Sequence, residues 1–318
     1  MFAITTKSLV LSSAVATAML LSGCGAKQEH TITLNIGFQK YGVLPIVKAQ
    51  GSLEQALKAQ GVAVKWVEFP AGPQLLEGLN VGSVVFGESG EAPPIFAQAA
   101  NSNLVYIANQ PASPLGEALV VQKDSNIQSV ADLKGKRVAL NKGSNVHYLL
   151  LKVLEANHLK LSDIEVVYLP PSDARAAFER GAVDAWVIWD PFLAAAEHQI
   201  GARALVTGEN LVSNHQFYLA DRQFAQDNPE ILNTVVKTLN TTTQWVKDHQ
   251  TDAAKLLQKP TGLEFEILNT SISRMGFGVT PISNQVAKEQ QYVADAFYQQ
   301  KLIPNQLNIQ SAILSHSE

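Results

Sequence analysis

The chain has 318 residues, of which 46% are hydrophobic and 16% are charged, and its formal net charge is −4. This balance is typical of a globular protein and excludes a disordered chain. It also excludes the strongly basic face that nucleic-acid binding requires, so we expect no nucleic-acid partner. The length predicts roughly two domains.

The N-terminal segment has the pattern of an export signal. Lys7 is the one charged residue among the first 24, and an apolar run from Leu9 to Leu21 follows it. The run is too short and too weakly flanked for a membrane-spanning helix. It ends in Leu21-Ser22-Gly23-Cys24, which resembles the bacterial lipobox. The resemblance implies cleavage before Cys24 and lipidation of its thiol.

Residues 1–23 are therefore expected to be a lipoprotein signal peptide, and residues 24–30 a tether to the membrane. The alternative is an ordinary secretory signal that leaves one free thiol. Cys24 is the one cysteine in the sequence. If it is lipidated, internal disulfides, a cysteine zinc site and a cysteine nucleophile are all excluded. The seven histidines show no metal-ligand spacing, and we expect no cofactor or metal.

Strands and helices are predicted to alternate along the first part of the chain. Strands are expected at residues 31–38, 62–69, 83–86 and 104–108, and helices at about 44–60, from Pro73 to near Gly82, and at 92–100. Gly-rich turns separate them. This alternation predicts an α/β fold, with a mainly parallel sheet covered by helices on both faces.

The segment Gln110–Gly116 interrupts the alternation and is interpreted as a crossing into a second lobe. There we expect strands at 118–122, 138–140, 164–169, 185–189 and 204–206, with helices at 129–135, from 146, at 171–180 and at 191–198. The chain is expected to cross back between residues 210 and 217 and to be mostly helical from Asn228 onward. Lobe 1 is thus predicted to comprise residues 31–114 and 211–318, and lobe 2 residues 115–210.

Three turns follow strands, at the end of a sheet where ligands bind in such folds. They contain Gln39, the stretch Gly87-Glu88-Ser89-Gly90-Glu91, and Lys142-Gly143-Ser144-Asn145. The last of these opens a helix, whose free N–H groups and dipole favour an anion. The alternative is that Ser144 or Asn145 serves only as a helix cap.

The chain resembles the aliphatic-sulfonate binding proteins of ABC importers, within the nitrate, sulfonate and taurine solute-binding family. Matching segments run in order over most of the chain: Ile36–Lys40, Trp66–Gln74, Leu79–Gly82, Pro93–Ala100, Ser129–Gly135, Lys142–Ser144, Asp173–Phe178, Val183–Trp186 and Trp189–Pro191. The resemblance implies a type II periplasmic-binding-protein fold, with two lobes and a cleft between them. It further implies an exported, monomeric binder that delivers a small organosulfonate to a membrane permease for sulfur uptake, without catalysis.

A sulfonate is an anion whose oxygens only accept hydrogen bonds, so its site must offer donors. Gly143 lets the backbone approach closely, while Ser144 and Asn145 supply donors at a helix start. Gln39 can donate from the other lobe, and the resemblance places it in the cleft. Ser89, in the predicted turn at Gly87–Glu91, is also expected to bind the ligand.

Two residues near Pro191 have competing interpretations. Trp189 ends a predicted strand, so its indole face suits the apolar tail of an organosulfonate, although it could instead be a core aromatic. Trp186, three residues earlier on the opposite face, is assigned to the core. Asp190 is either a helix cap before Pro191 or a residue that contacts or supports the ligand.

Glu88 departs from the pattern of the sulfonate family, which commonly has Ser-Thr-Gly-Asp at residues 88–91. An unpaired carboxylate there would repel an anion. Three arrangements are open: Glu88 is exposed or bridges the lobes, it pairs with Lys40 or Lys142, or it holds the ammonium group of an aminosulfonate such as taurine.

Other functions remain as alternatives. Taurine-type or nitrate-type binding is possible within the same family. A pyrimidine-synthesis enzyme on the same fold is disfavoured, because such enzymes need a cysteine-rich segment and a cytoplasmic address. His147 shares a helix face with Ser144, but no third residue orients the pair as a nucleophile. A purely structural lipoprotein would show no stabilisation by ligand.

Overall fold

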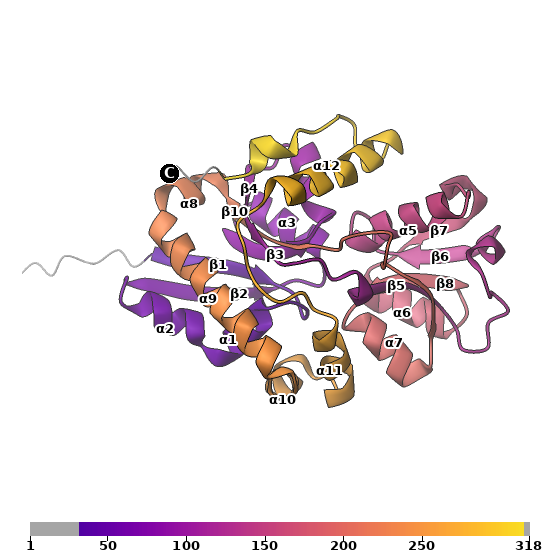
Figure 1. Ribbon diagram of the computed structural model, residues 1–318, viewed down its shortest axis with the longest axis horizontal. Helices are drawn as coiled ribbons and strands as arrows, with labels where there is room; N and C mark the ends of the chain where they lie inside the picture. Colours follow the sequence, from indigo (N-terminus) through magenta and orange to yellow (C-terminus); the bar gives the residue numbers. More distant parts are fainter. Residues whose placement is uncertain (1–31, 315–318) are drawn as a thin grey trace, which may run out of the picture. The chain divides into compact units, whose positions relative to one another are not determined.

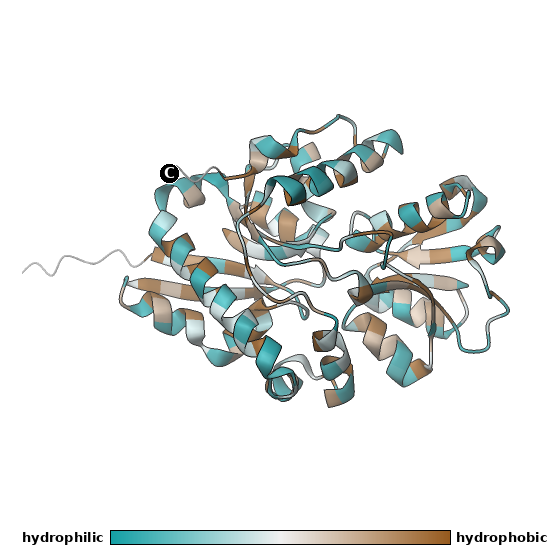
Figure 2. Cartoon of the chain, viewed as in Figure 1, coloured by the Kyte–Doolittle hydropathy of each residue, from teal (hydrophilic) through white to brown (hydrophobic). Residues whose placement is uncertain are grey.

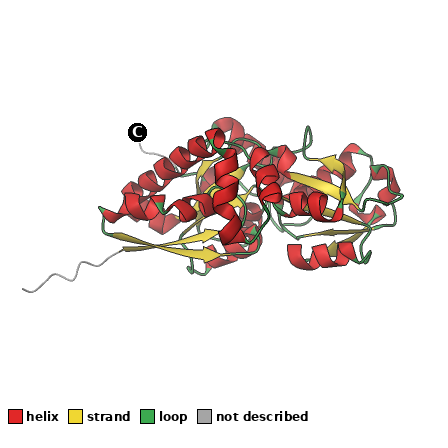
Figure 3. Cartoon of the chain, turned by 90° about the horizontal axis from the view of Figure 1, so that it is seen from below, coloured by secondary structure: helices red, strands yellow, loops and turns green. Residues whose placement is uncertain are grey.

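The computed structural model describes residues 32–314. The predicted signal peptide, the lipobox cysteine Cys24 and the tether lie outside the described residues. The described residues belong to one compact unit. Within the part described, no helix is long and apolar enough to span a membrane. The unit contains two five-stranded sheets with helices packed along their strands (Figures 1 and 3).

The first sheet has the order β2-β1-β3-β10-β4. Its strands are β1 (Ile32–Phe38), β2 (Val62–Glu68), β3 (Phe86–Gly90), β4 (Leu104–Asn109) and β10 (Gln216–Asp221). β1 pairs in parallel with β2 and β3, whereas β10 runs antiparallel between β3 and β4. The helices of this part are α1 (Leu44–Gln50), α2 (Ser52–Lys58), α3 (Gly72–Asn80), α4 (Pro93–Ala99), α8 (Arg222–Asp227), α9 (Pro229–Asp248), α10 (Gln250–Thr261), α11 (Phe265–Ser273) and α12 (Asn284–Gln299).

The second sheet has the order β7-β6-β8-β5-β9. Its strands are β5 (Glu117–Val121), β6 (Arg137–Leu140), β7 (Glu165–Tyr168), β8 (Ala185–Trp189) and β9 (Arg203–Thr207). The helices that accompany it are α5 (Asn145–Ala156), α6 (Pro171–Glu179) and α7 (Phe192–Ile200). β6 is parallel to β7 and β8, and β5 is antiparallel to β8 and β9. Both sheets are therefore mixed, and the α/β fold class is confirmed.

Apolar residues on the strands and on the inward helix faces build the core, while the residues on the outer helix faces are mostly hydrophilic (Figure 2). One cluster packs β1 and β3 against α1, α2, α9 and α10, and another packs α3, α4 and α12. Trp186 is fully buried and packs beside Phe178, which confirms its assignment to the core. The long helix α9 lies alongside α1 and α2 (Figure 1).

Several predicted elements differ from the structure. The helix expected at 44–60 is two helices, because Gly51 adopts a left-handed conformation (φ 65°) that ends α1 and precedes α2. The short helix expected at 129–135 is a 3₁₀ turn over Val130–Leu133. The crossing expected to reach Phe217 ends earlier, because β10 begins at Gln216.

The strand expected at residues 83–86 is also displaced along the chain. β3 comprises Phe86–Gly90, so Glu88 and Ser89 belong to a strand and not to the turn after it. All five residues of β3 are buried. The lobe boundaries predicted from the sequence stay a prediction. The strands of the first sheet do, however, come from both ends of the described chain, on either side of those of the second.

Candidate functional site

A small cavity lies where β1 and β3 of the first sheet meet the start of α5 and the end of β8. Its volume is about 30 Å³, enough for about two water molecules and suited to a compact head group. We call it the head cavity. It is lined by Gln39, Tyr41, Gly72, Glu88, Gly90, Pro93, Gly116, Ser144, Asn145, Trp189, Asn214 and Gln216. Among these described residues none is a lysine or an arginine, so an anion here would be held by neutral donors.

The start of α5 provides backbone donors to this cavity. Gly143 has a positive φ of 74°, and Ser144 is extended just before the helix. The Ser144 hydroxyl donates to the carbonyl of Asn141 at 2.6 Å and therefore does not cap the helix through its side chain. The backbone N–H groups of Asn145 and Val146 make no hydrogen bond to other described residues. Unpaired N–H groups at a helix N-terminus form an anion site.

Asn145 lines the head cavity, but its side-chain amide is engaged with the protein. Its Nδ2 donates to Oδ1 of Asn214 at 2.6 Å, and its Oδ1 accepts from the backbone N–H of Ala92 at 3.1 Å. The side chain thus joins the start of α5 to the turn after β3 and to the segment before β10. The side chain is therefore a link between these segments. One N–H of its amide is used in that link, and the second N–H and the backbone N–H remain as donors.

Gln39, just after β1, and Trp189, at the end of β8, both line the cavity. The Nε2 of Gln39 donates to the backbone carbonyl of Glu88 at 3.2 Å. Because a carboxamide nitrogen has two N–H groups, the second is available to a ligand. Trp189 ends β8, is only partly buried, and meets Phe192 edge-to-face.

Both residues also line a second, wider cavity of about 370 Å³, which we call the tail cavity. Its lining is Gln39, Lys40, Tyr41, Glu68, Phe69, Pro70, Pro171, Ser172, Trp189, Pro191 and Phe192. The aromatic rings and prolines make most of this lining apolar. Because Gln39, Tyr41 and Trp189 line both cavities, a polar head group and an apolar tail could occupy adjoining spaces.

Glu88 is 3% exposed and lines the head cavity from β3. Its Oε2 accepts from the backbone N–H groups of Val43 and Leu44 at 3.2 and 3.3 Å. Burial raises the pKa of the Glu88 carboxyl to about 8, although those two hydrogen bonds oppose the rise. A carboxyl with this pKa is mostly neutral at pH 7, so it does not impose a full negative charge on the cavity.

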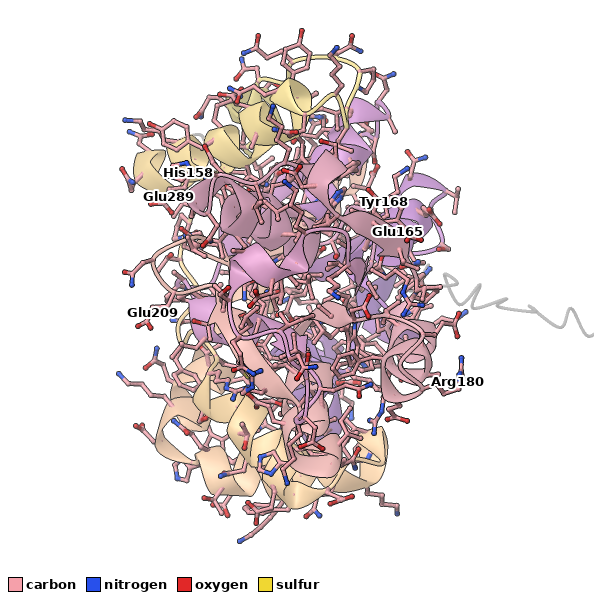
Figure 4. The ribbon with its side chains drawn as sticks, turned by 90° about the vertical axis from the view of Figure 1, so that its right-hand side faces the viewer. His158, Glu165, Tyr168, Arg180, Glu209 and Glu289 are labelled. Atoms are coloured by element: carbon pink, nitrogen blue, oxygen red, sulfur yellow. The ribbon has the colours of Figure 1, made fainter. Side chains whose placement is uncertain are left out.

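An exposed Glu88 and a Glu88 paired with Lys40 or Lys142 are both wrong. The residue is not exposed, and among the described residues it forms no ion pair with a lysine. Lys40 extends toward the backbone carbonyl of Thr261, while Lys142 lies over the ring of Tyr168. Tyr168, the partner of Lys142, lies close to Glu165 on β7, one of the two edge strands of the second sheet (Figure 4).

Three other predicted site residues support the cavity without lining it. Ser89 is fully buried, and a side chain at Gly72 would collide with its hydroxyl. Gly143 packs against the ring of Phe96. Asp190 accepts from the backbone N–H of Ala194 at 3.0 Å, as a residue at a helix start does, and its carboxylate lies 3.4 Å from Arg274.

The environment of Asp190 favours a structural role. The side chain is fully buried, and burial raises its pKa to about 7, while the neighbouring guanidinium of Arg274 opposes the rise. Arg274 also pairs with Glu197 of α7 at 2.7 Å.

His147 is buried among Phe96, Tyr168 and Phe297. Its Nδ1 accepts from the N–H of Gly143 at 3.3 Å, so it does not activate Ser144.

Several lining residues could not be identified from the sequence. Tyr41 follows Gln39 in the same turn, and its buried hydroxyl has no hydrogen-bond partner among the described residues. Asn214 and Gln216 come from the segment that crosses back to the first sheet. Tyr41 lies beside a predicted ligand turn, which was a usable signal. No pattern marked Asn214 or Gln216. Within residues 32–314, no group of three or more histidine or acidic side chains could hold a metal ion.

Comparison with known proteins identifies the class. The sequence matches the family described as NMT1/THI5 like over residues 57–253. A relative from Escherichia coli strain K12, which carries the name aliphatic sulfonates-binding protein, is 42% identical over 91% of this chain and 90% of its own length. The chain belongs to the NMT1/THI5-like family, and its close relatives in that family are solute-binding proteins rather than enzymes.

Two solved structures agree with that assignment. The alkanesulfonate-binding protein SsuA from Xanthomonas axonopodis pv. citri, bound to MOPS, is 41% identical with a TM-score of 0.85 and covers 89% of this chain and 98% of its own. The periplasmic aliphatic sulphonate binding protein SsuA from E. coli is 40% identical with a TM-score of 0.82, over 90% of this chain and 93% of its own. These likenesses confirm the periplasmic-binding-protein fold and indicate export to the periplasm.

Proposed function

We propose that this protein captures an organosulfonate anion between its two sheets and delivers it to an ABC permease. The observation that carries the proposal is the junction of the two cavities. The head cavity offers backbone N–H groups at the start of α5 and the Gln39 amide, and it shares Gln39, Tyr41 and Trp189 with the apolar tail cavity. A sulfonate has the same two parts, a head that only accepts hydrogen bonds and an organic tail.

In this proposal the residues have distinct roles. Gly143, Ser144 and Asn145 set the helix start that holds the head group, and Gln39 donates to it from the other side. Trp189 covers the tail. Glu88 contacts the head group, while Ser89 and Asp190 support the walls of the site. The lobes are residues 31–114 with 211–318 and residues 115–210, and the bound ligand holds them together.

We further propose that the mature protein is a monomer anchored to the membrane by a lipid on Cys24. The support is the sequence Leu21-Ser22-Gly23-Cys24 after an apolar run, together with relatives that are periplasmic proteins. Mass spectrometry of the protein isolated from its native membrane tests the lipid. A peptide beginning at an acylated Cys24 is expected, and an unmodified N-terminus would contradict the anchor.

Titration calorimetry with a panel of anions tests the proposed ligand. Straight-chain alkanesulfonates should bind, and each added methylene that enters the tail cavity should tighten binding by about 0.8 kcal/mol, or roughly fourfold. Nitrate and sulfate lack a tail and should bind more weakly than butanesulfonate. Tighter binding of taurine than of ethanesulfonate would favour an aminosulfonate carrier. Absence of binding by every sulfonate would refute the proposal.

A further inference from the structure

Glu88 is an acidic residue in the wall of a cavity that we assign to an anion. Its two oxygens have different surroundings. Oε2 accepts two backbone hydrogen bonds, from Val43 and Leu44, whereas Oε1 is buried and has no partner among the described residues. The unpartnered oxygen belongs to a residue that lines the head cavity. A buried polar atom without a partner is costly, so a ligand that completes its bonding is favoured.

The backbone around Glu88 fixes this arrangement. Gly42 has a φ of 96°, and a side chain there would place its Cβ 2.2 Å from Oε1 of Glu88. The turn after β1 therefore needs glycine both for its conformation and for space beside the carboxyl. Gln39 holds the other side of the same residue through its backbone carbonyl. The carboxyl is positioned by the fold, with little freedom to turn toward water.

The ionisable groups that face Glu88 offer no positive charge to balance a carboxylate. Tyr218, its partner on β10, and Tyr41 are both buried phenols with pKa values raised by burial and, in smaller part, by the Glu88 charge. Glu117 and Asp190 act on the same Tyr41, so the surroundings contain further acids. Asp190 has Arg274 as its partner, but among the described residues Glu88 has no such cation.

We propose that Glu88 binds the ligand as a neutral carboxylic acid, whose Oε1 hydroxyl donates a hydrogen bond to an oxygen of the anionic head group. This inference rests on the proposed function, because it concerns the same site. A protonated carboxyl keeps its carbonyl oxygen for the N–H groups of Val43 and Leu44 and presents its single donor to the cavity. The residue then selects for an anion that has acceptor oxygens and no ammonium group at that position.

The proposal makes ligand binding dependent on a proton. If Glu88 ionises in the unliganded protein, binding the anion must take up one proton, which comes from the buffer. The raised pKa of Glu88, about 8, sets the pH at which this proton uptake begins. Above that pH, the apparent Kd for a sulfonate should rise about tenfold for each further pH unit, since the sulfonate itself does not titrate. Below it, the Kd should be nearly constant.

Calorimetric titration of butanesulfonate from about pH 6.5 to about pH 9.5, in buffers without sulfonate groups, tests the proposal. The wild type should show the alkaline rise in Kd and a net uptake of protons. Glu88→Gln retains an acceptor for the two backbone N–H groups and gains an amide donor for the cavity. This variant should bind with a Kd that is nearly independent of pH and should take up no proton.

Glu91→Gln is the matched control. Glu91 is another buried acid just beyond β3; its Oε2 accepts from the backbone N–H of His215 at 3.1 Å, and it does not line the head cavity. This variant should keep the alkaline rise of the wild type. A rise that disappears in Glu91→Gln but persists in Glu88→Gln would overturn the proposal.

Four further outcomes are decisive. A wild-type Kd that is constant up to about pH 9.5 would overturn this inference and leave sulfonate binding intact. Loss of binding by a folded Glu88→Gln at every pH would also overturn it, because the amide supplies the same donor. Taurine binding that strengthens above pH 8 would show that an ionised Glu88 holds an ammonium group. Absence of sulfonate binding by the wild type at any pH would instead refute the proposed function.

Discussion

Asn145 and Asn214 are joined by a hydrogen bond of 2.6 Å, although they lie 69 residues apart in the sequence. Asn145 begins α5 beside the second sheet, and Asn214 lies in the segment that returns to the first. The same Asn145 side chain accepts from the N–H of Ala92, just beyond β3. This pair therefore connects the parts of the chain that enclose the head cavity, and ligand binding should depend on it.

Replacing Asn145 with alanine tests that dependence. Asn145→Ala leaves the Asn214 side chain and the Ala92 N–H without their buried partners, at a cost of about 1–3 kcal/mol. Because the segments around the head cavity lose the bonds that join them, affinity for butanesulfonate should fall by about 10- to 100-fold in calorimetry. Asn157→Ala is the control, because the Asn157 side chain donates to the Val153 carbonyl at the far end of α5 and does not line the head cavity. Equal affinities for the two variants would contradict this role.

Trp189 should affect the tail more than the head group. Trp189→Ala removes an aromatic wall shared by both cavities. We expect affinity for hexanesulfonate to fall about tenfold or more, because apolar contact area is lost, and affinity for methanesulfonate to change by less than about threefold. Trp66→Ala, on the outer strand β2, should leave both affinities unchanged. Equal losses for the long and short ligands would show that Trp189 does not contact the tail.

The sequence was informative where local chemistry decides the structure. The Gly143-Ser144-Asn145 turn before α5 and the burial of Trp186 could both be predicted, because turn residues and strand periodicity are local signals. β10 could not be. It is an interior strand whose first five residues are buried, it has no alternation of polar and apolar residues, and it directly follows an irregular segment.

The site itself was only partly predictable. Glu88 and Ser89 were placed in a turn because polar residues beside glycines favour turns, but tertiary structure makes them a buried strand. Such disagreement between local preference and the fold is expected at functional sites. The side-chain partners of Asn145 depend on contacts with Asn214, far away in the chain, for which the sequence contains no local signal.

The burial of Glu117 predicts how the stability of the fold depends on pH. It is fully buried, neither of its carboxyl oxygens has a hydrogen-bond partner among the described residues, and burial raises its pKa well above the usual value of 4.5, with Glu91 adding to the rise. The folded state thus prefers the protonated form. The contribution of Glu117 to the free energy of unfolding is therefore fully present below about pH 4.5. It is lost as the pH rises toward the pKa that Glu117 has in the folded protein.

Glu117→Gln should therefore change Tm little at about pH 5 and raise it relative to the wild type at about pH 9. Differential scanning calorimetry of the unliganded protein at the two pH values measures the effect. Glu165→Gln is the control, since Glu165 is exposed on β7 (Figure 4), and it should leave the pH dependence of Tm unchanged. A glutamine variant of Glu117 that is less stable at about pH 9 than the wild type would contradict the assignment.

Arg274 should be needed mainly for stability. Its guanidinium lies 3.4 Å from the fully buried Asp190 and 2.7 Å from Glu197. Arg274→Met leaves a buried carboxylate unpaired, which costs about 3–5 kcal/mol in the free energy of unfolding. Because the pKa of Asp190 is already raised to about 7, protonation should reduce that loss at lower pH.

Urea unfolding at about pH 8 and at about pH 5 tests this difference. Arg175→Met is the comparison, because Arg175 pairs with Glu179 on a partly exposed helix surface and should cost about 1 kcal/mol or less. If both arginine variants lost the same stability at the higher pH, the Asp190 pair would not be the stabilising contact.

The position of a bound ligand tests the account most directly. A crystal structure of the protein with butanesulfonate should place the sulfonate oxygens in the head cavity, within hydrogen-bonding distance of the N–H groups of Asn145 and Val146 and of the Glu88 carboxyl. The butyl chain should lie in the tail cavity against Trp189. A sulfonate group bound elsewhere, or a reversed ligand with its alkyl chain in the head cavity, would contradict it.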